Sequence, residues 1–231
     1  MLTIISTPIG NLGDLSLRAA KAISQSDILL SEDTRSAFKL LDYIAQEYKL
    51  TKEADLKVIS YYREKEFQKL PEVMGYLEAG KTVTLITDAG TPLIADPGSL
   101  LVQTCVKKGY EIDVIPGASA LTTILPYDDS GRGNVLFVGF LPKKKSDCIR
   151  TLERAVLATS TMKDTKVVFY ESPLRIQATL QIIDELFPDA TVLIGRELTK
   201  KFQEIIRGNA SELKTREYKG ELSVILHIPT K

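Results

Sequence analysis

The sequence predicts an α/β protein built on a parallel sheet. Short apolar runs recur along the chain, segments with helical periodicity separate them, and no tight hairpin signal joins one run to the next. Strands that alternate with helices need crossover connections, which are right-handed in parallel sheets. With 231 residues, the chain is long enough for one large domain or two small ones.

In the first half of the chain, apolar runs predict strands at residues 2–6, 28–30, 56–60, 82–88 and 111–115. Ser16 is expected to cap the helix that follows the first strand. Further helices are expected at residues 36–48, 66–79 and around 101–106, and Gly80 and Gly109 are expected to end the last two. Pro71 leaves open whether the helix at 66–79 begins at residue 66 or at the proline itself.

In the second half, strands are expected at residues 135–140, 166–170, 191–194 and 222–228, and helices at 149–158, 176–187 and 211–216. The continuous apolarity of residues 222–228 predicts a strand that is covered on both faces. His227 lies inside this run, so we expect it in the core. The pattern loosens between residues 121 and 134, which indicates a boundary between two domains.

The charge balance and the cysteines exclude several classes of protein. Thirty basic residues balance thirty acidic ones, so any site for a polyanion must be a local patch. Cys105 and Cys148 lie in helical surroundings far apart in the sequence, which is typical of a reducing compartment and offers no metal-ligand spacing. The N-terminal run has no basic flank and is too short for a signal peptide or a membrane span. We expect a cytoplasmic protein with no membrane partner.

Polar loops follow the strands of the first half, at residues 7–14, 31–35, 88–98 and 116–120. The carboxyl ends of parallel strands share one edge of a sheet, where open α/β folds bind ligands. In the loop after residues 82–88, Gly90 and Gly98 allow close approach of the backbone to a ligand, and Asp88 and Asp96 offer acceptors. We interpret this loop as the holder of a small polar molecule; the alternative is an ordinary turn between strand and helix.

Other common sites are disfavoured. No lysine follows a glycine-rich loop in the pattern of a P-loop nucleotidase. Ser119 has no histidine near it in the sequence, and the single histidine lies in a strand, so a Ser/His/Asp hydrolase is unexpected. No metal site is predicted.

Charged residues follow two strands of the second half. Glu171 and Arg175 lie after one strand, and Arg196 and Glu197 after another. We favour a functional role for them because they come directly after apolar runs, although solvated surface is the alternative. The basic run at residues 143–145 is either a solvated loop or a local phosphate-binding patch, to which Lys200 and Lys201 would add if the fold brings them close.

Seven ordered motifs resemble the ribosomal small subunit methyltransferase I family of the tetrapyrrole methylase superfamily. They are TPIGNLGD at 7–14, SEDTR at 31–35, TDAGTPLIADPG at 87–98, PGASA at 116–120, GFLP at 139–142, YESPLR at 170–175 and RELTK at 196–200. The resemblance implies two α/β/α domains, at residues 1–118 and 119–231, with a parallel N-terminal sheet and a mixed C-terminal sheet. It also implies a homodimer that uses S-adenosylmethionine, held in a cleft between the domains, to methylate the ribose 2′-hydroxyl of a cytidine in 16S rRNA. The partner is then 16S rRNA or the assembled small ribosomal subunit.

The resemblance implies specific cofactor contacts. They are Pro8, Gly10, Asp88, Ala89, Gly90, Thr91, Leu93, Ile94, Ala118, Ser119, Leu198 and Thr199. Transfer to a ribose hydroxyl needs partial removal of its proton, and our candidates for this task are Asp33, Glu171 and Lys200. Phosphate binding is expected from Arg35, Lys143, Arg175 and Arg196.

The sequence also departs from the family pattern. Leu174 stands where the family usually has histidine, and the sequence ends soon after residues 220–222, where many members continue. These departures favour one alternative, a methylase of a small tetrapyrrole-like molecule. A further alternative is a non-catalytic module that binds S-adenosylmethionine.

Overall fold

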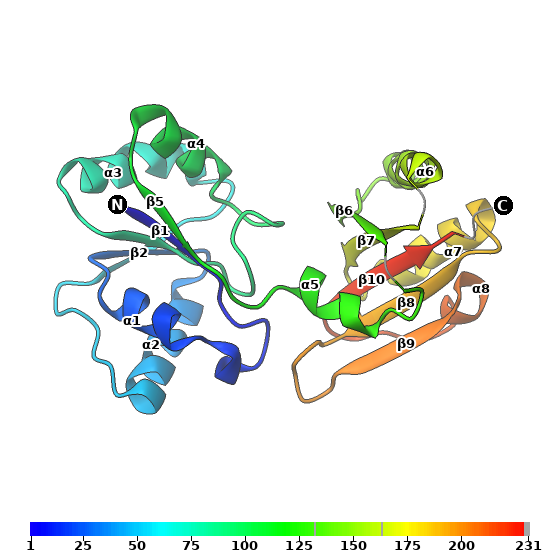
Figure 1. Ribbon diagram of the computed structural model, residues 1–231, viewed down its shortest axis with the longest axis horizontal. Coiled ribbons are helices and arrows are strands. Elements are labelled where there is room, and N and C mark those ends of the chain that lie inside the picture. The colour runs from blue at the N-terminus through cyan, green and yellow to red at the C-terminus, as the bar shows by residue number, and fades with distance from the viewer. Residues whose placement is uncertain (132, 163, 229–231) are drawn as a thin grey trace. The chain divides into compact units, whose positions relative to one another are not determined.

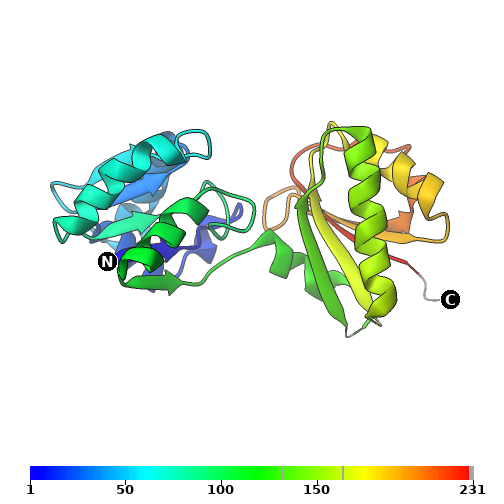
Figure 2. The same cartoon turned by 90° about the horizontal axis from the view of Figure 1, so that it is seen from above.

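A computed structural model describes residues 1–131, 133–162 and 164–228. The chain forms two compact units, Met1–Ser119 and Ala120–Lys231. Each unit has its own sheet and its own helices (Figures 1 and 2). Within the described ranges, no helix is both long and apolar enough to cross a membrane.

The first unit contains a five-stranded sheet in which every neighbouring pair is parallel. Its strands are β1 (Leu2–Ile5), β2 (Ile28–Ser31), β3 (Lys57–Ser60), β4 (Val83–Leu85) and β5 (Ile112–Ile115). They are arranged in the order β3-β2-β4-β1-β5. The predicted strands and the parallel sheet are confirmed. Because β4 is the central strand and β1 lies next to it, the loops after these two strands are neighbours at one sheet edge.

Helices cover both faces of this sheet. They are α1 (Leu17–Ser24), α2 (Thr34–Tyr48), α3 (Glu66–Glu78) and α4 (Ser99–Lys108), with the 3-10 turn η1 (Leu12–Asp14) before α1. Leu29 packs with α1 and α2, whereas its neighbours Ile28 and Leu30 pack with α3 and α4. This alternation follows from the two-residue period of a strand. As predicted, Ser16 caps α1 by accepting from the amide of Ala19 at 3.1 Å.

Pro71 lies inside α3, which begins at Glu66. The start of α4 has no cap from its own chain segment, and Glu66 supplies one from α3. Its buried Oε1 accepts from the backbone amides of Gly98, Leu100 and Leu101 at 3.2, 2.9 and 3.3 Å. These amides would otherwise lack acceptors, and a negative charge at a helix N-terminus is favourable.

Replacing Glu66 with alanine is therefore expected to lower the free energy of unfolding by about 2 kcal/mol, because it removes a charged acceptor from three amides. Urea unfolding measures this change. The control is Glu64→Ala two residues earlier, at an exposed position, where a change within about 0.5 kcal/mol is expected. Equal effects of the two substitutions would contradict the capping role.

The second unit contains a mixed five-stranded sheet in the order β6-β7-β10-β8-β9. Its strands are β6 (Asn134–Phe140), β7 (Thr165–Glu171), β8 (Thr191–Arg196), β9 (Glu204–Asn209) and β10 (Leu222–His227). The β6–β7 pair is parallel, and β10 runs antiparallel to both of its neighbours. The predicted mixed sheet and the strand at residues 222–228, buried along most of its length, are confirmed.

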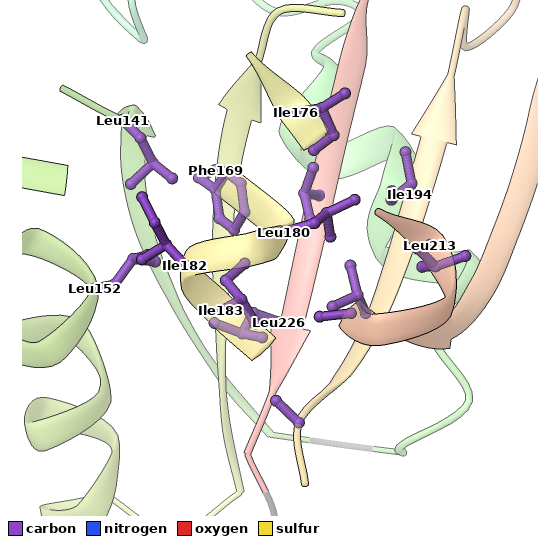
Figure 3. Packing of buried hydrophobic residues seen from close by; sticks show 14 of the residues in the cluster. Leu141, Leu152, Phe169, Ile176, Leu180, Ile182, Ile183, Ile194, Leu213 and Leu226 are labelled. Atoms are coloured by element: carbon purple, nitrogen blue, oxygen red, sulfur yellow. The ribbon is translucent and has the colours of Figure 1, made fainter. Parts of the chain in front are cut away.

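Three helices, α6 (Lys145–Thr161), α7 (Ile176–Leu186) and α8 (Ala210–Leu213), cover one face of this sheet. Figure 3 shows the core between them and the strands, in which Leu152 of α6 and Leu180 of α7 meet Phe169 of β7. The short α5 (Ala120–Ile124) lies against the sheet through Ile124, which approaches Gly195 of β8. The 3-10 turn η2 (Leu125–Tyr127) follows it.

Two elements of this unit were missed, and other expectations for it were wrong. The strand β9 and the helix α5 were not predicted, and α6 starts at Lys145 instead of residue 149. His227 lies at the end of β10 with 22% of its side chain exposed, and its Nε2 lies 2.8 Å from Oδ1 of Asp128. Its place at the strand end, beside a buried carboxylate, keeps it out of the apolar core.

Candidate functional site

The loops after β1 and β4 are joined at the carboxyl edge of the first sheet. Thr7 and Gly90 exchange two backbone hydrogen bonds, of 2.9 and 3.1 Å. The hydroxyl of Thr7 donates to the carbonyl of Thr87 at 3.0 Å, and this hydroxyl is buried. Segments that are eighty residues apart in the sequence are thus fixed next to each other.

The loop after β5 joins the same group. Oγ1 of Thr91 lies 2.9 Å from Oγ of Ser6 and donates to the carbonyl of Ala118 at 3.2 Å. A Cβ atom on Gly117 would lie 3.0 Å from the carbonyl oxygen of Ser6, so the two backbones are in close contact. We call residues 6–10, 87–94 and 117–119 the joined loops.

Every cofactor residue expected in the first unit lies on the joined loops. Pro8 and Gly10 follow β1; Asp88, Ala89, Gly90, Thr91, Leu93 and Ile94 follow β4; Ala118 and Ser119 follow β5. Asp88, Ala89 and Ile94 are exposed, whereas Pro8, Gly90 and Ser119 are buried. Leu93 has a φ of 69°, a left-handed conformation that a bulky side chain rarely adopts. The predicted convergence of these loops is therefore confirmed, and the loop after β2 joins them, since the amide of Asp33 donates to Oδ1 of Asp88 at 3.2 Å.

Three carboxylates cluster beside the joined loops. Glu32 follows β2, and Asp88 and Asp96 lie in the loop after β4. Burial and the charges of Asp96 and Asp88 raise the pKa of Glu32 to about 7. Partial desolvation of their carboxylates likewise raises the pKa values of Asp88 and Asp96 above their ordinary range. Oε1 of Glu32 is buried and has no hydrogen-bond partner among the described residues.

Glu32 was not among the side chains predicted from the sequence, which favoured its neighbour Asp33. No signal in the sequence distinguishes two adjacent carboxylates; only their environments do. Asp33 caps α2, accepts from the amide of Arg35 at 2.8 Å and forms an ion pair with that guanidinium at 2.6 Å. The hydrogen bonds from Arg35 lower the pKa of Asp33 to about 2. Asp33 is therefore a weak proton acceptor at neutral pH.

In the second unit, Glu171 is held on all sides. Its side chain is 1% exposed and forms an ion pair with Arg175 at 2.5 Å. It also accepts from the hydroxyl of Thr179 at 2.9 Å and from the amide of Ser172 at 2.8 Å. Arg175 in turn donates to the carbonyl of Leu141 at 2.9 Å, which fastens the loop after β7 to the loop after β6. This arrangement favours a role for Glu171 in positioning Arg175.

Lys200 lies between two carboxylates, at 3.0 Å from Glu197 and 2.8 Å from Glu221. Burial alone would lower the pKa of Lys200. The hydrogen bonds to Glu221 and Glu197 outweigh this effect and raise the pKa above its ordinary value. Lys200 is therefore a fixed cation at neutral pH. Arg196 pairs with Glu204 at 3.0 Å.

Leu198 is buried between two residues of left-handed conformation, Glu197 with φ 49° and Thr199 with φ 65°. Lys143 is exposed in the loop after β6.

Comparison with known proteins identifies the family. The family model described as Tetrapyrrole (Corrin/Porphyrin) Methylases matches residues 1–214. The chain belongs to the tetrapyrrole methylase family. It is 36% identical over 229 residues to the Ribosomal RNA small subunit methyltransferase I of Thermotoga maritima, covering 97% of each chain. It is 38% identical over 236 residues to the protein of the same name in Mesomycoplasma conjunctivae, covering all of this chain and 92% of the relative.

Solved structures show the same fold. The methyltransferase CobJ matches with a TM-score of 0.71 at 15% identity, over 98% of this chain and 93% of that one. The uroporphyrin-III C-methyl transferase of Thermus thermophilus, solved with S-adenosylhomocysteine, matches with a TM-score of 0.62 at 12% identity, over 97% of this chain and 95% of that one. The predicted family, the fold class and the class of S-adenosylmethionine-dependent methyltransferase are confirmed.

The joined loops of this methylase fit a methyl donor of this kind. Gly90 has a φ of 89°, and an added Cβ would lie 3.3 Å from Ile9, so glycine is needed to hold this turn against the loop after β1. The exposed carboxylate of Asp88 is an acceptor for hydroxyl groups or for an ammonium group. S-adenosylmethionine carries a ribose, an ammonium and a carboxylate, and it supplies the methyl group as a sulfonium.

Proposed function

We propose that this chain transfers a methyl group from S-adenosylmethionine to the ribose 2′-hydroxyl of a cytidine in 16S rRNA, as a homodimer. The observation that carries the proposal is the likeness to curated rRNA methyltransferases over nearly the whole chain, at 36 to 38% identity. The joined loops support it, since they offer polar backbone and a carboxylate at one sheet edge.

For the cofactor we propose the residues of the joined loops, with Leu198 and Thr199 as further contacts. For the phosphates of the acceptor we propose Arg35, Lys143, Arg175 and Arg196, because guanidinium and ammonium groups bind phosphate oxygens. Arg175 is the best prepared of these, since Glu171 and the carbonyl of Leu141 fix its guanidinium.

The three predicted catalytic side chains receive different roles in the proposal. Lys200 supplies a positive charge, Glu171 positions Arg175, and Asp33 orients Arg35. We assign removal of the hydroxyl proton to Glu32, which lies at the same edge as the joined loops and has an oxygen without a partner among the described residues. An acceptor is most effective when its pKa lies near the working pH, and Glu32 meets this condition.

The proposal is tested by two measurements. Calorimetry should show binding of S-adenosylmethionine, and ribose-methylation mapping of 16S rRNA from cells that lack the protein should show one cytidine without its methyl group. Normal methylation in those cells, together with turnover of a porphyrin, would transfer the assignment to a small tetrapyrrole-like acceptor. Binding of the cofactor with no turnover on either substrate would indicate a non-catalytic module.

Replacing Gly90 with alanine is expected to weaken binding of S-adenosylmethionine about tenfold, because the residue has a positive φ and the new methyl group would crowd Ile9. Calorimetry measures the dissociation constant. The control is Gly75→Ala in α3, where a Cβ meets no atom within 4 Å. That substitution should stabilise the protein slightly, since alanine favours helices, and should leave the affinity unchanged.

A further inference from the structure

An aromatic group at the end of β6 and β7 has no role in the proposed reaction so far. Tyr170 lies edge-on to Phe137, with ring centroids 4.9 Å apart, and edge-on to Phe140, at 5.5 Å. The hydroxyl of Tyr170 accepts from the amide of Leu121 at 3.0 Å, which fixes its ring. Phe140 is the outermost member, with 56% of its surface exposed. A large aromatic side chain that packs against one neighbouring ring and is more than half exposed offers ring surface to another molecule.

The loop after β7 carries a second exposed apolar side chain. Leu174 is 94% exposed. Arg175, the next residue, fastens this loop to Leu141, which directly follows Phe140 in the sequence. Exposure of large apolar side chains is unfavourable in water, and a cluster of them marks a site of contact with another molecule.

The charge next to Phe140 indicates the chemistry of that molecule. Lys143, Lys144 and Lys145 are exposed, and none of them forms an ion pair with a described residue. Arg150, one turn further along α6, is instead paired with Asp147 at 2.5 Å. Unpaired lysines beside an exposed aromatic ring are the combination that binds single-stranded nucleic acid, where phosphates meet the cations and bases stack on the ring.

We propose that Phe140, supported by Tyr170, is a stacking platform for an unpaired base of the RNA acceptor, and that Lys143–Lys145 bind the adjacent phosphates. The inference rests on the proposed function, since it requires an RNA acceptor. A second copy of the chain is a less suitable occupant. A two-fold contact through this patch would bring the lysines of both copies together, and like charges at such a contact are unfavourable.

The sequence contains no tryptophan, which allows a direct test with a short single-stranded RNA that carries cytidine. In Phe140→Trp the new indole should retain the affinity for this RNA, and its fluorescence should be quenched when the RNA binds. Phe67→Trp is the matched control, since Phe67 is 79% exposed on α3 in the first unit. Its fluorescence should not change when the RNA is added.

Phe140→Ala should weaken binding of the same RNA about 5- to 150-fold, the range for loss of one base-aromatic stack. The dependence of its affinity on salt should stay unchanged because no charge is removed. Replacing Lys143, Lys144 and Lys145 together with glutamine should instead reduce the salt slope by about 0.7 for each phosphate that the protein no longer neutralises. Phe67→Ala should bind the RNA as the wild type does. All variants should retain the wild-type affinity for S-adenosylmethionine in calorimetry.

Different failures have different meanings. If the wild type binds the RNA and Phe140→Ala binds it equally well, or if Phe140→Trp binds it without quenching, the platform is wrong and the proposed function stands. If the wild type binds S-adenosylmethionine but no RNA, the stacking platform and the proposed function are both wrong. If Phe140→Ala instead changes a dimer into a monomer in sedimentation, the patch is a contact between copies and the platform is overturned.

Discussion

Replacing Glu32 with glutamine is expected to lower the rate of methyl transfer about 100-fold, the lower end of what a positioned proton acceptor contributes. Glutamine keeps the size of the side chain and removes only its ability to take a proton. Glu32 has a pKa of about 7, raised by burial and by Asp96 and Asp88. In the wild type the rate should therefore rise with pH through this value, and in Glu32→Gln this rise should disappear.

The matched control is Asp33→Asn at the adjacent position. The pKa of Asp33 is about 2, so this residue stays charged throughout the working range and cannot produce a rise near neutral pH. Its substitution should leave the midpoint of the pH profile where it is. A wild-type profile that is flat between about pH 5 and pH 9, or one that Glu32→Gln leaves unchanged, would contradict the assignment.

The same pKa predicts an effect on stability of defined sign. The folded protein keeps a proton on Glu32 at pH values where the unfolded chain, with an ordinary glutamate pKa of about 4.3, has lost it. Stability due to this group is therefore lost as the pH rises from the ordinary value toward 7. Glu32→Gln should raise the melting temperature at about pH 8 more than at about pH 4. If Glu32 had a purely structural role, its substitution would lower the melting temperature at both pH values.

Replacing Asp128 with alanine is expected to lower the free energy of unfolding by about 3 to 5 kcal/mol, the cost of removing one partner from a buried ion pair. The side chains of Asp128 and Lys166 are 1% and 7% exposed, and they are in direct contact. Asp128 also accepts from the hydroxyl of Ser130 at 2.8 Å and bonds to His227. Without Asp128, the charge of Lys166 stays in the core with only the carbonyl of Gly131 as a described partner.

The loss of stability in Asp128→Ala is expected to depend on pH, because the pKa of Asp128 is shifted in the folded protein. Burial alone would raise the pKa of Asp128. The hydrogen bonds from Lys166, Ser130 and His227 outweigh this effect and hold the pKa well below its ordinary value. The stabilisation is therefore present above the ordinary aspartate pKa of about 3.9 and is lost as the pH falls below it. Urea unfolding at neutral and at acidic pH measures both the loss and its decline.

A surface ion pair is the control. Glu78 and Lys108 lie 2.9 Å apart, with 55% and 47% of their side chains exposed. Glu78→Ala should change the free energy of unfolding by no more than about 1 kcal/mol. An effect of Asp128→Ala as small as this control would show that Lys166 finds water or another partner when its carboxylate is removed.

Local patterns in the sequence were sufficient for most of the fold. The capping serine at residue 16 and the glycines at residues 80 and 109 act over a few residues, so their effects are visible in the sequence. The strand β9 (Glu204–Asn209) was missed because its apolar content is low and it lies at an edge of the sheet. The charged partner of His227 was missed because Asp128 lies ninety-nine residues away.

By itself, the sequence determined the family, the alternation of strands and helices, and the loops that carry the cofactor residues, because motifs and periodicity are properties of neighbouring residues. Only the tertiary structure decided which side chains change their chemistry. Glu32 and Asp33 are adjacent in the sequence, yet one has a pKa of about 7 and the other of about 2. The difference arises because residues distant in the chain bring carboxylates to Glu32, whereas the helix after β2 directs Arg35 to Asp33. Burial and the distances between charges set a pKa, and folding alone determines both.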